Sequence, residues 1–105
     1  MAELFILEIE GFGADEYKKV NDLLGIDMDS GEGNWPHGLV SHASGAYPGG
    51  WRVVEVWDSQ ADQEAFMTSR LSAALHQAGV DKPPSKAEWT KLHRHHMPKQ
   101  KAAAG

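Results

Sequence analysis

The stretch HGLVSHASGAYPGGWRVVEVWDSQADQEAF, residues 37–66, decides the fold of this chain. Residues 37–46 and 51–58 are rich in strand-forming side chains, and the YPGG sequence between them predicts a tight hairpin turn. Ser59 stands three residues before an Asp, which is the spacing of a helix N-cap. Apolar residues then recur at helical intervals to about Ala78, where a Gly follows. The stretch therefore predicts a strand, a turn, a second strand and a helix.

The flanking segments extend this order in both directions. Residues 3–10 predict a strand, with apolar side chains alternating on both faces. Residues 14–24 have the spacing of an amphipathic helix, and residues 26–36 predict an acidic loop. Residues 88–97 predict a last strand. The order β-α-β-β-α-β is typical of an α+β, ferredoxin-like fold with an antiparallel sheet.

The domain organisation is simple. The length of 105 residues favours one domain, which we place at residues 1–97, and residues 98–105 are expected to form a disordered tail. In a ferredoxin-like fold the helices cover one face of the sheet, yet the strand at residues 3–10 is apolar on both faces. A second copy of the same sheet would cover the other face, so we expect a homodimer.

Composition excludes several classes of function. The formal net charge of −5 argues against a nucleic-acid partner. The chain has no cysteine, so it has no disulfide and no thiolate metal site. No apolar run approaches the roughly 20 residues of a membrane helix, and no signal peptide is visible. We expect a cytoplasmic protein with neither a membrane nor a nucleic acid as partner.

The central stretch resembles a known group of proteins. Gly38, Leu39 and His42 lie on the first strand, a GGWRV-x2-VW pattern spans residues 49–57, and a helix containing Phe66 follows. This pattern is similar to that of antibiotic biosynthesis monooxygenase-like proteins of the dimeric α/β-barrel superfamily. The resemblance implies a small-molecule cavity between sheet and helices in each subunit. It does not choose the chemistry, because the superfamily includes cofactor-free oxygenases, cyclases, heme-degrading enzymes and proteins of unknown role.

Two readings of the function stay open. In the first, the homodimer is a cofactor-independent monooxygenase or a cyclase-like enzyme acting on a small apolar or aromatic metabolite. His42 is the catalytic candidate, since imidazole titrates near neutral pH, and His42→Ala should lower turnover by roughly 10²–10⁴ without changing the melting temperature. The substrate-binding candidates are Tyr17, Trp35, Trp57 and Phe66, with Trp35 on a lid loop. In the second reading, the same cavity carries or senses a ligand without catalysis, or the chain is only a dimerisation unit.

Other polar residues give weaker candidates. His76 matches the helix position at which heme-degrading relatives place their iron ligand, although Phe5 and Phe66 replace an Asn and a Trp expected in those enzymes. Heme through His76 is therefore an alternative to having no cofactor. His93 and His95 would share one face of the predicted last strand, as two metal ligands do. The strand carboxylates Glu8, Glu10 and Glu55 are expected to be solvated.

Overall fold

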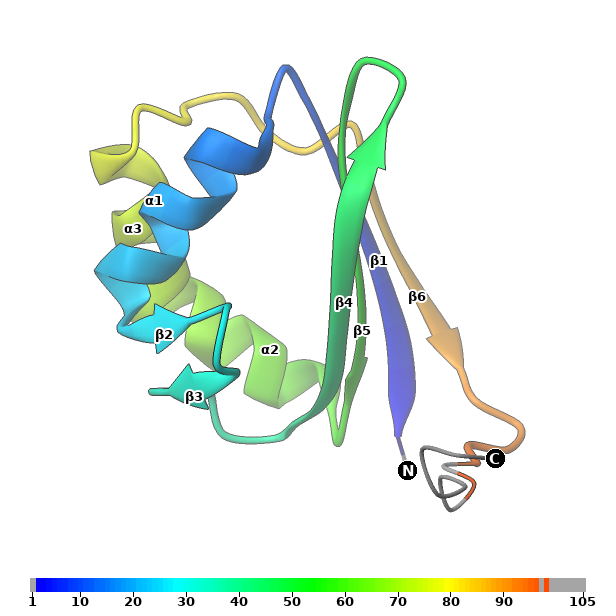
Figure 1. Ribbon diagram of the computed structural model, residues 1–105. Coiled ribbons are helices and arrows are strands. Elements are labelled where there is room, and N and C mark those ends of the chain that lie inside the picture. Colours follow the sequence, from blue (N-terminus) through cyan, green and yellow to red (C-terminus); the bar gives the residue numbers. More distant parts are fainter. Residues whose placement is uncertain (1, 97, 99–105) are drawn as a thin grey trace, which may run out of the picture.

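The computed structural model describes residues 2–96 and residue 98. A four-stranded antiparallel sheet in the order β4-β5-β1-β6 carries all the longer helices on one face (Figure 1). This confirms the expected α+β, ferredoxin-like arrangement. In chain order the elements are β1 (Glu3–Glu10), α1 (Ala14–Leu24), β2 (Ile26–Asp27), β3 (Glu32–Gly33), β4 (Leu39–Tyr47), β5 (Gly50–Trp57), α2 (Gln60–Phe66), the π-helical η1 (Met67–Leu71), α3 (Ser72–Gln77) and β6 (Lys86–Lys91).

The β4–β5 hairpin has the turn that the sequence predicts. Tyr47 pairs with Gly50 at its end, and Gly49 adopts a positive φ of 97° that few other residues tolerate. The register set by this turn places His42 directly opposite Glu55. The hairpin therefore brings two polar side chains from different strands to the same place.

The second helix begins as predicted but is not uniform. The Ser59 hydroxyl accepts a hydrogen bond from the Asp62 backbone N–H at 3.1 Å, which caps α2. A π-helical turn, η1, then joins α2 to α3. Within it the Thr68 and Ser69 hydroxyls donate to carbonyl oxygens one turn earlier, at 3.0 and 2.6 Å, a contact that competes with regular helical bonding. The expected single helix is thus continuous, with a π-helical segment between its two α-helical parts.

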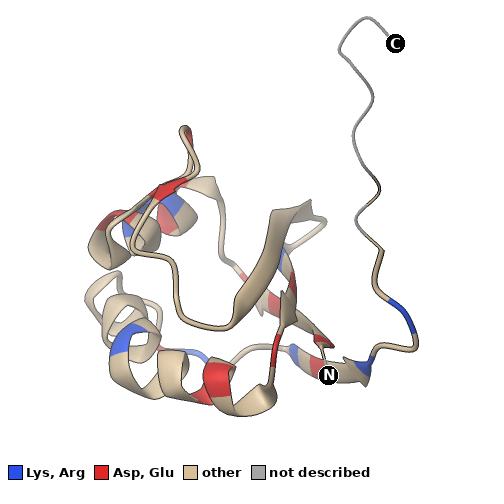
Figure 2. Cartoon of the chain, turned by 90° about the horizontal axis from the view of Figure 1, so that it is seen from below, with Lys and Arg blue, Asp and Glu red and all other residues tan. Residues whose placement is uncertain are grey.

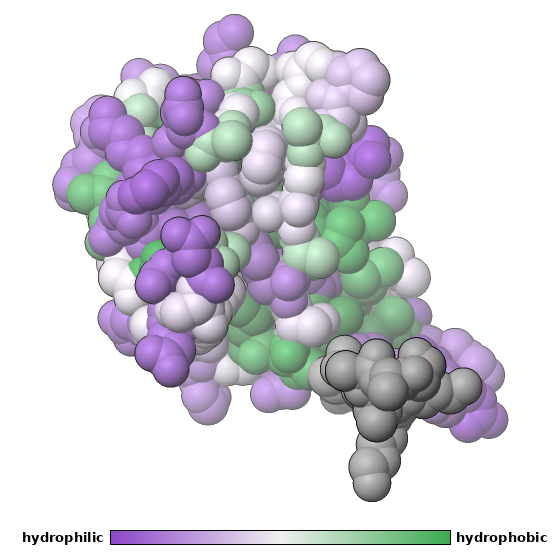
Figure 3. Space-filling view, viewed as in Figure 1, coloured by the Kyte–Doolittle hydropathy of each residue, from purple (hydrophilic) through white to green (hydrophobic). Residues whose placement is uncertain are grey.

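The two faces of the sheet differ as the alternation in β1 predicts. Phe5, Leu7 and Ile9 are buried against the helices, and this burial is the main favourable contribution to folding. Leu4 and Ile6 point to the opposite face, where they lie beside Val56 and Val54 of β5. Figure 3 shows apolar surface on that side of β4, away from the helices. The chain by itself leaves this face without helical cover.

The last strand differs from the prediction. β6 covers residues 86–91 rather than 88–97, because its partner β1 begins at Glu3, which pairs with Lys91. The ladder between β1 and β6 ends at this pair. The expected tail at 98–105 lies outside the described residues, apart from Pro98. No helix in the described ranges is long and apolar enough to cross a bilayer.

The segment at 26–36 is also more ordered in form than a plain loop. Ile26 pairs with Gly33 and Asp27 with Glu32, which makes a short hairpin with two residues on each strand. Ile26 is buried in the core, and this anchors the segment against the end of α1. Trp35 follows the hairpin and packs against the core as a half-buried side chain.

Candidate functional site

A cavity lies between the sheet and the helices, where the resemblance placed it. The volume open to the centres of water-sized spheres is about 70 Å³. One water needs about 10–15 Å³ by this measure, and pockets for drug-sized ligands reach about 300–1,000 Å³. The cavity therefore admits several waters or a small organic molecule. Its wall is mostly apolar, and the polar side chains on it are Tyr17, Asn21, His42, Glu55 and Gln63.

His42 and Glu55 form the centre of the polar wall. Nδ1 of His42 lies 2.7 Å from Oε2 of Glu55, and the two side chains are only 13% and 11% exposed. An ionised carboxylate can only accept hydrogen bonds, so Nδ1 donates to Glu55, and in the neutral imidazole this leaves Nε2 as an acceptor. The pair therefore fixes both the orientation and the tautomer of the imidazole.

Tyr17 extends this pair into the space beside α1. Its hydroxyl lies 2.6 Å from Nε2 of His42 and, given the tautomer, donates its proton to that nitrogen. Burial raises the pKa of the Tyr17 phenol above 10.0; hydrogen bonds from Ser44 and Asn21 oppose this, and the negative charge of Glu55 adds to it. The phenol is thus protonated at neutral pH and serves as the donor.

Trp57 holds the other end of the chain of hydrogen bonds. Its indole N–H donates to Oε1 of Glu55 at 3.0 Å, and the side chain is completely buried. The result is an unbroken sequence from Trp57 through Glu55 and His42 to Tyr17. Each member restrains the next, which is the arrangement that keeps a reactive imidazole in one position.

Trp35 closes the cavity near His42. The two ring centroids are 5.7 Å apart, and the indole N–H donates to the Gly31 carbonyl at 2.9 Å. Arg70, from the π-helical turn, donates to the carbonyl oxygens of Leu24 and Asn34 at 2.9 and 2.6 Å. Arg70 thereby connects the segment that carries Trp35 to the end of α1 and to η1. β4, the strand that carries His42, has no Lys, Arg, Asp or Glu (Figure 2).

The structure brings together four of the residues singled out from the sequence. His42, Tyr17, Trp35 and Phe66 line the cavity. Trp57 does not line it, because its ring lies in the core behind Glu55.

His76 lies outside the cavity. Its side chain is 82% exposed and faces Asp81, with 3.3 Å between Nδ1 and Oδ1. An exposed histidine and a small cavity do not fit heme.

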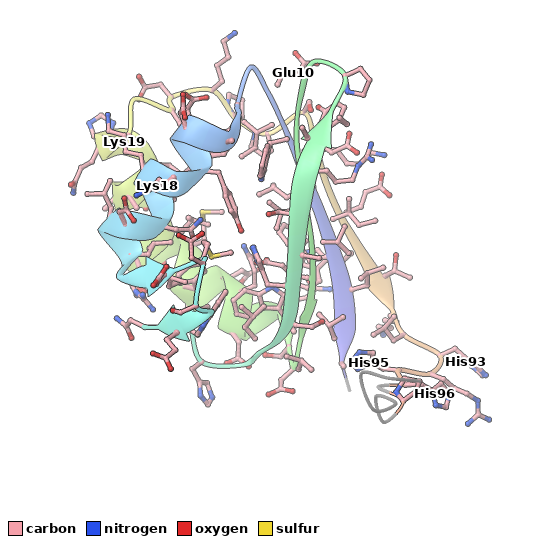
Figure 4. The ribbon with its side chains drawn as sticks, in the orientation of Figure 1. Glu10, Lys18, Lys19, His93, His95 and His96 are labelled. Atoms are coloured by element: carbon pink, nitrogen blue, oxygen red, sulfur yellow. The ribbon has the colours of Figure 1, made fainter. Side chains whose placement is uncertain are left out.

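The C-terminal histidines do not form the expected strand face. His93 and His95 follow the end of β6 and are exposed (Figure 4). The alternation of a strand therefore does not apply to them. Within the described residues, no three His, Cys, Asp or Glu side chains are placed to hold a metal ion.

Glu55 is the residue that sequence reasoning missed. It was expected to be solvated, but the residue as a whole is 9% exposed, and its carboxylate is bonded to both His42 and Trp57. The signal was present in the hairpin, because a turn that pairs Tyr47 with Gly50 sets His42 opposite Glu55. Glu8 was also expected to be solvated, but its side chain is 13% exposed and pairs with Arg52 at 2.6 Å, whereas Glu10 is exposed; neither lines the cavity.

Comparisons with known proteins agree on the fold. No protein-family model and no curated protein matches the sequence. A crystal structure provisionally assigned as an antibiotic biosynthesis monooxygenase from Chloroflexus aurantiacus J-10-fl is similar to this chain, with a TM-score of 0.63 and 14% identity. The match covers 92% of this chain and 98% of that one. A protein of unknown function from Nitrosomonas europaea has a TM-score of 0.62 and 19% identity over 94% and 95% of the two chains. The chain has the fold of these two proteins.

Proposed function

We propose that this chain is a small-molecule enzyme that removes a proton from a planar, mainly apolar or aromatic substrate. The observation that carries the proposal is the continuous hydrogen-bond chain from Glu55 through His42 to Tyr17, which ends in an apolar cavity. Proton removal is the step shared by cofactor-independent oxygenation and by cyclisation, the two activities that the sequence suggests.

The residues divide the work as follows. The Tyr17 oxygen accepts the substrate proton while its own proton moves to Nε2 of His42. The imidazolium that results is stabilised by the Glu55 carboxylate at Nδ1. The substrate anion remains among apolar side chains, where water does not compete for it. It can then transfer an electron to dioxygen, or attack a carbonyl group of the same molecule.

The test is proton exchange, because it needs no knowledge of the natural substrate. α-Tetralone has a weakly acidic C–H group beside a carbonyl, and its exchange with D2O is followed by NMR or mass spectrometry. We expect the protein to accelerate this exchange and His42→Ala to lower the acceleration by roughly 10²–10⁴. His76→Ala is the matched control, because that histidine is exposed and distant from the cavity. Equal rates for the protein and for His42→Ala would contradict the proposal.

A binding module without catalysis remains the second candidate. The small volume of the cavity favours it, since a pocket of this size can hold a small ligand without any chemistry. It predicts that small phenols bind in the cavity while α-tetralone exchanges at the uncatalysed rate.

The uncovered face of the sheet supports a homodimer. Leu4, Ile6 and Val54 are half-buried on that face, and no helix in the described residues covers them. A second copy packed sheet to sheet would bury this apolar surface, and identical surfaces match under two-fold symmetry. The dimer would leave the cavity intact, because the cavity lies on the opposite face of the sheet.

A further inference from the structure

Gln63 is a buried polar residue that the hydrogen-bond chain does not use. It lies in the middle of α2, lines the cavity and is 6% exposed. Its neighbour on the helix, Gln60, donates to Glu3 at 2.9 Å. Within the described residues, the Gln63 amide makes no such bond to another group.

The Gln63 amide is unpartnered in the described residues but is not sealed off by packed atoms. The one sealed side-chain polar atom without a partner in the described residues is Nε1 of Trp51. The amide atoms of Gln63 therefore retain some accessible surface, and Gln63 is one of the residues that line the cavity. Buried amides are normally hydrogen-bonded, so a free one in a pocket calls for a partner from outside the chain.

The polar groups of the cavity come from opposite walls. His42 and Glu55 project from the sheet, and Tyr17 meets them from α1. Gln63 comes from α2, which with η1 and α3 forms the other helical side of the site. Between them the wall is formed by aromatic and aliphatic side chains such as Phe5, Leu7 and Phe66.

We infer that Gln63 is a specificity-determining residue that binds a second oxygen atom of the substrate. The preferred ligand is then a small planar molecule with two oxygen functions, one at Tyr17 and His42 and the other, a carbonyl or a hydroxyl, at Gln63. This inference rests on the proposed function for the first of these two positions. A neutral amide both donates and accepts, so it recognises either form of the second oxygen.

The experiment compares ligands that differ in one carbonyl group. Binding of the ortho, meta and para isomers of hydroxyacetophenone is measured by calorimetry against the corresponding ethylphenols, which have nearly the same shape. One net hydrogen bond corresponds to a preference of about two- to tenfold for the carbonyl compound in at least one isomer pair. Gln63→Met keeps the volume and the helix, and we expect it to remove this preference while ethylphenol binding stays the same. Gln63→Leu serves if the methionine variant does not fold.

Gln60→Met is the matched control, since it removes a glutamine from the same helix outside the cavity. It should retain the preference for the carbonyl compound. If the ethylphenols bind as well as the carbonyl compounds, or if the preference survives in Gln63→Met, the role of Gln63 is overturned. Neither outcome affects the proposed function. Failure of every phenol to bind would overturn the proposed function together with this inference.

Discussion

His42 and Glu55 face each other across β4 and β5, with 2.7 Å between Nδ1 of the imidazole and Oε2 of the carboxylate. Each residue comes from a strand that is fixed by its neighbours on the sheet, so the contact depends on register and not on a flexible loop. A direct cross-strand pair has its side chains close together by geometry alone. The imidazole is consequently oriented before any ligand arrives.

The first prediction concerns this orientation. Glu55→Gln keeps the size of the side chain, and with its amide oxygen held by the Trp57 N–H its NH2 group donates a hydrogen bond to Nδ1, which favours the tautomer with the proton on Nε2. That tautomer cannot accept from Tyr17, so we expect tetralone exchange to fall by about 10²–10⁴ while the fold is kept. Glu8→Gln is the control, because Glu8 pairs with Arg52 outside the cavity. Undiminished exchange in Glu55→Gln would mean that the carboxylate does not set the tautomer.

The second prediction revises the expectation that His42→Ala leaves the melting temperature unchanged. The substitution leaves the 11%-exposed carboxylate of Glu55 without its imidazole partner. Removing one partner of a buried hydrogen bond costs about 1–3 kcal/mol, and urea unfolding should show a loss of this size. If the two residues are coupled, His42→Ala in a Glu55→Gln background should cost less. Additive losses in this double-mutant cycle would show that the pair contributes no coupling energy.

The sequence predicts more of the fold than of the site. The alternation in β1, the spacing of α1 and the turn at residues 47–50 are local properties, and the structure contains all three. The end of β6 is not local, because it depends on where its partner β1 begins. The partnership of Glu55 with His42 is not local either, since it joins side chains on the two strands β4 and β5. Residues that depend on two elements at once were therefore the ones placed incorrectly.

The third prediction separates two tryptophans on the same strand. Trp57 is fully buried and donates to Glu55, whereas Nε1 of Trp51 is buried with no partner in the described residues. Trp57→Phe removes a satisfied donor and leaves the carboxylate short of one bond. Trp51→Phe removes an unsatisfied donor, which offsets part of the lost packing. We expect Trp57→Phe to lower the unfolding free energy by about 1–3 kcal/mol more than Trp51→Phe does. Equal losses in chemical unfolding would contradict the role of the indole bond.

The fourth prediction concerns alkaline pH. Burial raises the pKa of Tyr17 above 10.0, so the native state holds the phenol proton more tightly than the unfolded state does. This contribution to stability is fully present below pH 10.0 and is lost as the pH rises through the raised pKa. Tyr17→Phe has no such proton. The stability difference between the wild type and Tyr17→Phe should therefore shrink from about pH 9 to about pH 11.

The measurement for Tyr17 is urea unfolding of both proteins at each pH. Groups common to both, such as the lysines and Tyr47, cancel in the difference. A difference that stays constant across this range would show that the phenol titrates alike in the folded and unfolded states.

The fifth prediction tests the homodimer through Ile6. This side chain lies on the sheet face away from the helices and pairs with Val54 and Glu88 on the neighbouring strands. In the proposed dimer Ile6→Glu would bury a charge in an apolar interface without a partner, which is strongly unfavourable. We expect the wild type to sediment as a dimer at micromolar concentration and Ile6→Glu to sediment as a folded monomer. Leu23→Glu is the matched control, since Leu23 is 46% exposed on α1 and lies away from the sheet face; it should remain dimeric. A wild type that sediments as a monomer would exclude the dimer, and a dimeric Ile6→Glu would place the interface on another surface.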